Sequence, residues 1–133
     1  MNLEPFVAVS GAPGVFRLKT PRSNGLVVED IDTGKIKFFS TRKHQFTPLG
    51  TVAIYTLEDS TELKIIFETM LLQMGENPPV STNAPNHEIF EYFEKILPDF
   101  DEDRVYISDI KKVIKWFNFL NDRQLLNTSE EEE

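Results

Sequence analysis

The chain has 133 residues, no cysteine and a formal net charge of −8 at pH 7. This length fits one domain of ordinary size or two very small subdomains that share a core. The lack of cysteine excludes disulfide frameworks, thiolate zinc sites and cysteine nucleophiles. No stretch approaches the roughly 18–20 apolar residues of a membrane span, and the N-terminus has no signal-peptide pattern. We therefore expect a cytoplasmic protein with no membrane partner.

The net charge is divided unevenly along the chain. Residues 1–56 contain seven Lys or Arg against four acids, a net charge of +3, whereas residues 57–133 contain seven bases against eighteen acids, a net charge of −11. An acidic chain disfavours nucleic acid as a partner, because the phosphate backbone repels it. The segment 123–133 ends in four glutamates, and we predict that it is a disordered acidic tail.

The first part of the chain has the alternating pattern of short β-strands separated by turns. Asn24 and Gly25 tolerate positive φ and predict a turn, and Asp32 to Gly34 predicts another. The expected strands are 15–20, 26–31, 35–40 and 51–56. Residues 1–57 are therefore predicted to form a β-rich, SH3-like subdomain, built either as a small antiparallel sheet or as an SH3-like barrel.

The second part changes to helical periodicity. Its apolar residues form three stripes that are predicted to face inward: Leu63, Ile66, Phe67, Met70, Leu71 and Met74; Ile89, Phe90, Phe93, Ile96 and Leu97; and Ile110, Val113, Ile114, Phe117 and Leu120. A capping-box spacing between Asp59 and Glu62 predicts a helix that closes at Gly75, and a second helix is expected over 86–97. A third is predicted to begin at Ser108 as its N-cap. Residues 58–122 thus form the predicted helical subdomain, and the fold class is α+β with a three-helix C-terminal part.

Several segments carry a family resemblance. They are "SGAPGVFRL", "NGLVVEDIDTGK" and "IYT" at the front and "DRVYISDIKKVIKWFNFL" at the back. They resemble an uncharacterised family of small two-part proteins, common in Bacteroidetes and described as a domain of unknown function. The resemblance covers nearly the whole chain except the linker and the acidic tail. It implies a β-rich N-terminal part and a helical C-terminal part, but no activity and no catalytic residue.

The aspartates at 99, 101 and 103 have the spacing with which a calcium loop begins. An EF-hand loop that starts at Asp99 needs glycine at its sixth position and glutamate at its twelfth. Those positions hold Arg104 and Ile110. We interpret the segment as an acidic turn before the last helix, and we predict no metal and no cofactor.

The groups suited to catalysis are few. Histidine occurs only at His44 and His87, and no G-x-S-x-G motif is present. The glycines of "SGAPG" at 10–14 precede a strand instead of a helix, so a turn is a better interpretation than a phosphate-binding loop. We predict no catalytic residues and a protein that is not an enzyme.

The basic residues of the N-terminal part are candidates for partner binding. Arg17 and Lys19 lie two apart, as do Lys35 and Lys37, and each pair is expected to project from one face, opposite Ile36 and Phe38 on the later strand. The full set is Arg17, Lys19, Lys35, Lys37, Arg42 and Lys43. Three interpretations stay open: a sheet face kept soluble by its charges, a surface for an acidic protein, or a nucleic-acid site.

Aromatic residues exceed what the inward stripes of the helices need. Trp116 and Phe119 lie outside the inward stripe of the last helix, and Tyr92 flanks that of the second. Either they are sandwiched inside the monomer or they meet a partner, for which a second copy is the simplest choice. The leading hypothesis is a non-enzymatic binding or adaptor module that forms a homodimer, and the alternative is a nucleic-acid-associated protein.

Overall fold

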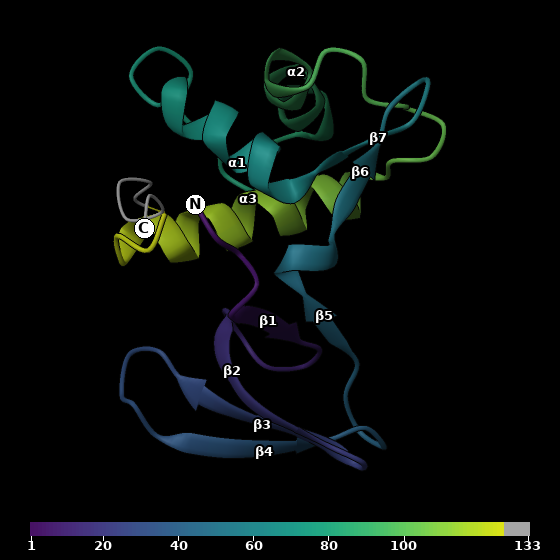
Figure 1. Ribbon diagram of the computed structural model, residues 1–133. Helices are drawn as coiled ribbons and strands as arrows, with labels where there is room; N and C mark the ends of the chain where they lie inside the picture. The colour runs from purple at the N-terminus through teal and green to yellow at the C-terminus, as the bar shows by residue number, and fades with distance from the viewer. Residues whose placement is uncertain (127–133) are drawn as a thin grey trace. The chain divides into compact units, whose positions relative to one another are not determined.

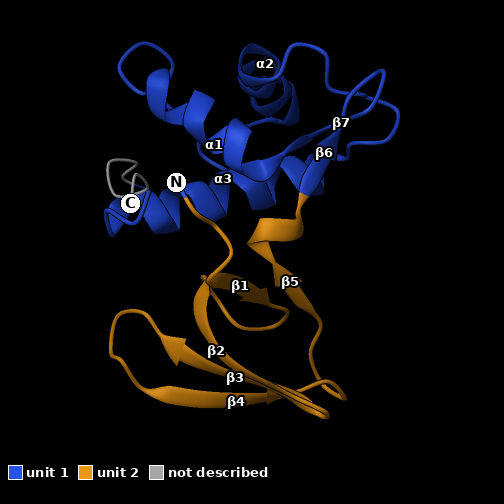
Figure 2. Ribbon diagram, in the orientation of Figure 1, with its two compact units in different colours: residues 1, 53–133 blue, residues 2–52 orange. Residues whose placement is uncertain are grey.

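The computed structural model describes residues 1–126, which form two compact units (Figure 2). A sheet unit spans Asn2–Val52, and a helical unit contains Met1 and, of the described residues, 53–126. The division follows Val52, five residues before the predicted boundary. An antiparallel sheet followed by three helices confirms the α+β class.

The sheet unit contains five antiparallel strands (Figure 1). Their order is β4-β3-β2-β1-β5. The bounds are β1 Phe6–Val9, β2 Phe16–Arg22, β3 Gly25–Asp30, β4 Ile36–Ser40 and β5 Phe46–Pro48, with a 3-10 turn at Leu49–Thr51. Three predicted strands correspond to β2, β3 and β4, whereas β1 and β5 were not predicted because each is too short to show alternation.

The sheet is open, so of the two predicted forms the SH3-like barrel is wrong. Among the described strands, β4 and β5 lie at opposite ends of the order and do not pair with each other. The strand predicted over 51–56 was expected to continue this sheet. Only Ala53–Tyr55 form a strand there, β6, and it belongs to the other unit. The sheet therefore has two edges, β4 and β5.

One face of the sheet carries the core of this unit. Val7, Val9, Phe16 and Val28 are buried together, and Leu18, Leu26, Phe39 and Phe46 pack against them. The Phe16 and Phe39 rings meet edge to face at a centroid distance of 5.3 Å. Such an apolar cluster is the main source of stability for a small sheet.

The turns differ in how they use glycine. Gly34 has φ +76°, as the β3–β4 turn requires, and the Asp30 carboxylate accepts the N–H groups of Asp32 and Thr33 at 2.9 and 3.1 Å. The β2–β3 turn was predicted to use positive φ at Asn24–Gly25, but neither residue has it. Gly25 is needed for space instead: a Cβ there would overlap the Phe39 carbonyl oxygen and lie 2.7 Å from Phe38 Cζ.

The helical unit begins with a hairpin of β6 and β7, Ser60–Glu62, and continues with three helices. The helices are α1 Leu63–Leu72, α2 Asn86–Ile96 and α3 Ile107–Asp122. The prediction that α1 starts after Asp59 was wrong, because residues 60–62 pair with β6 before the helix begins. Thr56 and Asp59 close the hairpin, with the Thr56 N–H donating to the Asp59 carbonyl at 2.9 Å.

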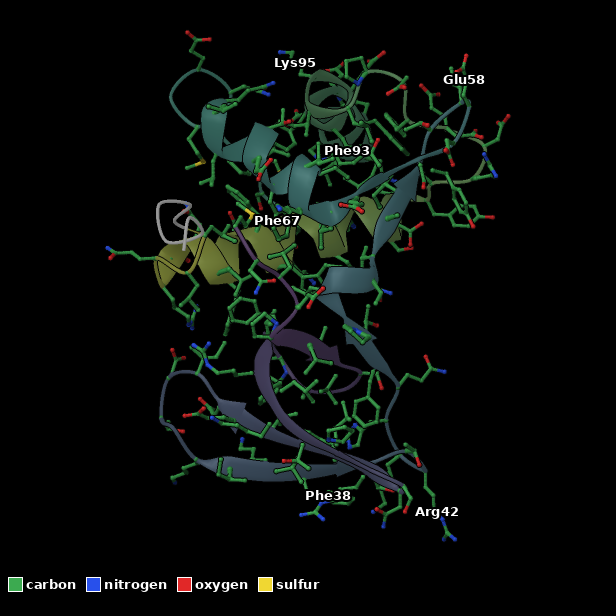
Figure 3. The ribbon with its side chains drawn as sticks, viewed as in Figure 1. Phe38, Arg42, Glu58, Phe67, Phe93 and Lys95 are labelled. Atoms are coloured by element: carbon green, nitrogen blue, oxygen red, sulfur yellow. The ribbon has the colours of Figure 1, made fainter. Side chains whose placement is uncertain are left out.

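Phenylalanine rings pack together in the core of the helical unit. Phe67 of α1 meets Phe117 of α3 at a centroid distance of 5.6 Å, and Phe93 of α2 meets Phe100, in the loop after α2, at 5.1 Å. Figure 3 labels Phe67 and Phe93 inside this unit, and both are fully buried. The predicted inward stripes of all three helices are thus confirmed.

The ends of α3 differ from the prediction. The helix begins at Ile107, and the Asp109 carboxylate accepts the Tyr106 N–H at 2.9 Å, so Ser108 is not the cap. Residues 123–126, assigned to the predicted tail, belong to the described part, where Leu126 is buried. The rest of that predicted tail, 127–133, lies outside the described residues. Among the helices of residues 1–126, none has the length and apolar character to cross a bilayer.

Candidate interaction surface

The strand register decides which side chains share a face of the sheet. Val28 pairs with Leu18 on one side and with Lys37 on the other, so these three side chains point to the core face. Val27 pairs with Thr20 and Phe38, and these point to the opposite face, which we call the outer face. Two further pairs, Arg17 with Glu29 and Glu29 with Ile36, lie on the outer face too.

The outer face exposes two large apolar side chains from β4. Ile36 is 59% exposed and Phe38 is 48% exposed. Figure 3 labels Phe38 on this unit, with Arg42 in the turn after β4. The Phe38 ring covers Gly25 of the neighbouring strand, where a Cβ would meet it. A half-exposed aromatic next to an exposed isoleucine is typical of a contact surface.

Ile36 and Phe38 were predicted to lie on the face opposite Lys35 and Lys37. Their separation from Lys37 is confirmed, but the face that carries the core is the one with Lys37 and not the one with Phe38. Phe39, not Phe38, packs against Phe16, and period-two alternation then sends Phe38 outward and Lys37 to the core face. Lys37 Nζ lies 5.8 Å from the Phe16 ring centroid and 3.7 Å from the Asp30 carboxylate at the edge of the core.

The six predicted partner-binding bases do not form one patch. Arg17 and Lys19 extend over the outer face, where Lys19 Nζ lies 3.0 Å from the Glu29 carboxylate and Arg17 lies over the Phe6 ring at 5.4 Å. Lys37 lies on the core face, and β3 separates β2 from β4. Lys35, Arg42 and Lys43 are exposed in turns and make no ion pair within residues 1–126.

Strand β4 has a free edge within the sheet unit. Its one neighbour in the described sheet is β3. The Asp30 N–H donates to the Lys35 carbonyl at 2.8 Å, and the Thr41 N–H donates to the Asn24 carbonyl at 3.0 Å. Main-chain groups alternate in direction along an antiparallel strand. Ile36, Phe38 and Ser40 therefore direct their N–H and C=O groups away from β3.

His44 has a structural position. Its Nδ1 lies 2.7 Å from the Ser10 carbonyl oxygen, which can only accept, so Nδ1 carries the proton. The imidazole packs on Phe39 at a centroid distance of 4.9 Å, and Ser10 Oγ accepts the Gln45 N–H at 2.7 Å. The glycines of the predicted turn, Gly11 and Gly14, both have φ +80°. Hydrogen bonds to Ser10 therefore hold this loop against residues 44 and 45. His87, the other histidine, is exposed on α2.

The aspartate-rich loop before α3 is closed by its own groups. The Asp101 carboxylate accepts the Asp103 N–H at 2.9 Å and pairs with Arg104 Nε at 2.8 Å. The Arg104 bond is the main cause of an Asp101 pKa below its usual range. The same guanidinium lies over the Tyr55 ring at 4.3 Å, a contact that sequence reasoning missed. Within residues 1–126, no three His, Asp or Glu gather as metal ligands.

The aromatics predicted as interfacial have different positions. Tyr92 is buried at 3% exposure inside the helical unit, so it is not at a surface. Its hydroxyl has no hydrogen-bond partner among residues 1–126, and burial raises the pKa of Tyr92. Trp116 and Phe119 are half-buried, and the Arg123 guanidinium covers the Phe119 ring at 3.6 Å.

Ile36 and Phe38, the two large exposed residues of β4, were not predicted to be at the surface. The adjacent phenylalanines at 38 and 39 were the available signal, because alternation lets only one of them face the core.

Comparisons with known proteins agree with the two-part layout. One family model, described as domain of unknown function DUF5606, matches residues 3–49, and another, domain of unknown function DUF6852, matches residues 52–120. A protein from Bacteroides vulgatus, solved by solution NMR in a structural genomics programme, is 31% identical. The alignment covers 90% of this chain and 85% of that one, with a TM-score of 0.70. No curated protein matches the sequence.

These matches confirm the resemblance to a family of two-part proteins of unknown function. The break between the two matched segments falls at residues 50–51, close to the division after Val52. The chain belongs to the family described as domain of unknown function DUF6852, preceded here by a DUF5606 segment.

Proposed function

We propose that this chain is a non-enzymatic protein-binding module and that its contact surface is the outer face of strands β2, β3 and β4. The observation that carries the proposal is the exposure of Ile36 and Phe38, two residues apart on one face. Monomeric proteins leave few large apolar side chains together in water, because burying each one stabilises by about 1.5–3 kcal/mol.

The charges around this apolar pair indicate the kind of partner that would fit. Arg17 and Lys19 lie on the same outer face, and Arg22 pairs opposite Gly25 at the end of the hairpin. Glu29 lies beside Ile36 and pairs with Lys19, so three bases stand against one acid. A partner with an apolar centre and an acidic rim complements this arrangement, as the usual division of an interface into core and rim requires.

The structural duties of the titratable groups support a non-enzymatic module. His44 donates to the Ser10 carbonyl, and Asp101 is engaged by Arg104 and the Asp103 N–H. These bonds engage the Asp101 carboxylate in the fold. Nε2 of His44 keeps a lone pair, but the contacts of this ring among residues 1–126 are with Ser10, Gly11 and Phe39 and not with a carboxylate that would orient a general base.

A homodimer stays part of the proposal, but its expected surface changes. Tyr92 is buried in the helical unit and cannot anchor a partner, and Phe119 is covered by Arg123. Trp116 is half-buried on α3. The exposed apolar pair on β4 is a better candidate for self-association than these helix residues.

The nucleic-acid alternative has less support. Lys19 and Lys37 are paired with Glu29 and Asp30 on opposite faces of the sheet, which leaves no continuous basic track for a phosphate backbone. It stays a prediction, as does the cytoplasmic location. An electrophoretic shift at low salt that disappears at 200 mM salt would support nucleic-acid binding, and the absence of a shift would end it.

Affinity capture with a matched control tests the protein-binding proposal. Tagged wild-type chain, an Ile36→Ser/Phe38→Ser variant and a Leu57→Ser/Leu72→Ser control, exposed in the helical unit, are compared in extracts of the source organism. We expect a protein that the wild type and the control retain and the sheet variant loses.

Reconstitution with that protein, purified, then gives the decisive result. Calorimetry should show an affinity at least tenfold weaker for the sheet variant than for the control. Equal binding by both variants, or capture that purified components do not reproduce, would contradict the proposed surface. Circular dichroism confirms that each variant is folded.

A further inference from the structure

We propose that two copies of this chain pair through their β4 strands, antiparallel, with Phe38 at the two-fold axis. The inference goes beyond the proposed function, because it uses the free edge of β4 and not the outer face itself. It follows from the direction of the main-chain groups of β4 and from the exposed side chains beside them.

The main-chain groups of β4 that face outward come from alternate residues. The hydrogen bond of Lys35 with Asp30 of β3 and that of Thr41 with Asn24, just before β3, bracket the strand, and Lys37 and Phe39 are in phase with them. Ile36, Phe38 and Ser40 are left with groups that face the free edge. An unpaired row of this kind is a template for another strand.

Three antiparallel self-pairings engage more than one outward-facing residue of each copy, with Lys37, Phe38 or Phe39 on the two-fold axis. Only the pairing with Phe38 on the axis engages all three outward-facing residues, because it sets Ile36 opposite Ser40 of the second copy. The Ser40 carbonyl already accepts the Lys43 and His44 N–H groups at 3.2 and 3.1 Å. The main-chain bonds expected are therefore two between the Phe38 residues and two from Ser40 N–H to Ile36.

The side chains favour the same centre. On the outer face, the exposed Ile36 and Phe38 of both copies become one apolar strip. On the core face, Lys37 comes opposite Phe39 of the second copy. The pairing centred on Lys37 would instead set two ammonium groups directly opposite each other, which is destabilising.

Disulfide trapping tests the pairing at residue level, because the natural chain has no cysteine. Directly opposed residues of antiparallel strands have Cα atoms about 4.5–5.5 Å apart, within reach of a disulfide. Phe38→Cys should give a covalent dimer on mild oxidation. The Ile36→Cys variant and the Ser40→Cys variant should each form little covalent dimer by itself. A mixture of the two variants should form a disulfide-linked heterodimer.

Matched controls separate pairing from chance collision. Leu72→Cys places a thiol at a position 87% exposed in the helical unit and measures random cross-linking. Lys37→Cys tests the competing pairing, in which Lys37 lies on the two-fold axis. We expect Phe38→Cys to cross-link at least tenfold faster than either control. A rate equal to that of Leu72→Cys, or faster trapping at position 37, would overturn the proposed pairing.

Sedimentation of the unmodified chain gives an independent test. A single short strand pair buries less than a standard interface, so we expect a concentration-dependent monomer–dimer equilibrium that Phe38→Lys shifts to monomer without loss of fold. A wild type that stays monomeric at millimolar concentration would reject the second copy as partner. The capture experiment would then still decide whether the outer face binds another protein, so the two failures are distinguishable.

Discussion

The sheet unit and the helical unit use their apolar residues differently. In the helical unit, large side chains from three helices converge, and Phe67, Phe93 and Phe117 are fully buried. In the sheet unit, one face gathers the core around Phe16 and Val28, while the other leaves Phe38 half-exposed. Helices that surround a core can bury their stripes on one another, but an open sheet always has a second face.

Because of this difference, we expect substitutions in the two regions to affect stability and association separately. Removing a buried ring from the helical unit should destabilise it, whereas replacing the exposed apolar side chains of the outer face should leave the fold intact and change association. The following predictions use these contrasts, beginning with the largest expected effect.

Phe67→Ala removes a fully buried ring that meets Phe117. We expect a loss of about 3–5 kcal/mol in unfolding free energy, because the substitution leaves a cavity in a packed core. Urea unfolding followed by fluorescence of Trp116, the single tryptophan, reports on this unit. Leu72→Ala, at an 87% exposed position of the same helix, should change stability by less than about 0.5 kcal/mol. Equal losses would contradict the described core.

Gly25→Ala should destabilise the sheet unit by about 1–3 kcal/mol, because a Cβ there overlaps the Phe39 carbonyl oxygen and crowds Phe38. Amide hydrogen exchange of β3 and β4 measures the loss. Gly75→Ala is the matched control, since a Cβ at Gly75 meets no atom within 4 Å. Slower exchange, or none of the expected acceleration, would show that the strands are not as close as described.

Tyr92→Phe should stabilise the helical unit by about 1 kcal/mol, because it removes a buried hydroxyl that no described residue hydrogen-bonds. Burial raises the pKa of Tyr92 in the folded chain. Its neutral form therefore contributes stability that is complete below the unfolded pKa of about 10 and is lost as pH rises above it. Wild-type stability should fall more steeply than that of Tyr92→Phe between pH 10 and 12, roughly the range above the unfolded pKa. Parallel pH curves would contradict this burial.

Asp101→Asn should produce the smallest effect, confined to acid pH. The folded pKa of Asp101 is lowered, mainly by the Arg104 bond, so its contribution is present above the unfolded pKa of about 3.9 and is lost as pH falls through the folded value. Carboxyl NMR titration of the wild type locates that value directly. Asp103→Asn, whose side chain makes no ion pair among the described residues, should leave the acid side of the stability curve unchanged.

Part of this architecture could be predicted residue by residue. The stripe of Leu63, Ile66, Phe67 and Met70 predicted the buried face of α1, and the turn at Gly34 was predicted from its residue type. The start of α1 could not be predicted, because residues 60–62 are strand only through pairing with 53–55. The strands β1 and β5 likewise depend on each other, since their pairing joins residues some forty positions apart.

The candidate surface was predicted less well than the fold. Arg17 and Lys19 were predicted on the surface and lie there, but the expected single basic patch depended on β2 and β4 being neighbours. Tyr92 was expected at an interface because it flanks an inward stripe, whereas packing in the helical unit covers it. The exposed Ile36 and Phe38 were missed, since an apolar strand residue is most often a core residue.

The amino-acid sequence alone determined the two-part α+β layout, the inward stripes of the helices and the separation of Ile36 and Phe38 from Lys37, because periodicity and turn chemistry are local properties. Tertiary structure alone decided that Phe39 and not Phe38 enters the core, that the sheet stays open and that β4 is an edge. Alternation fixes which residues share a face, but only contact with distant strands determines which face is buried and which strand is left without a neighbour.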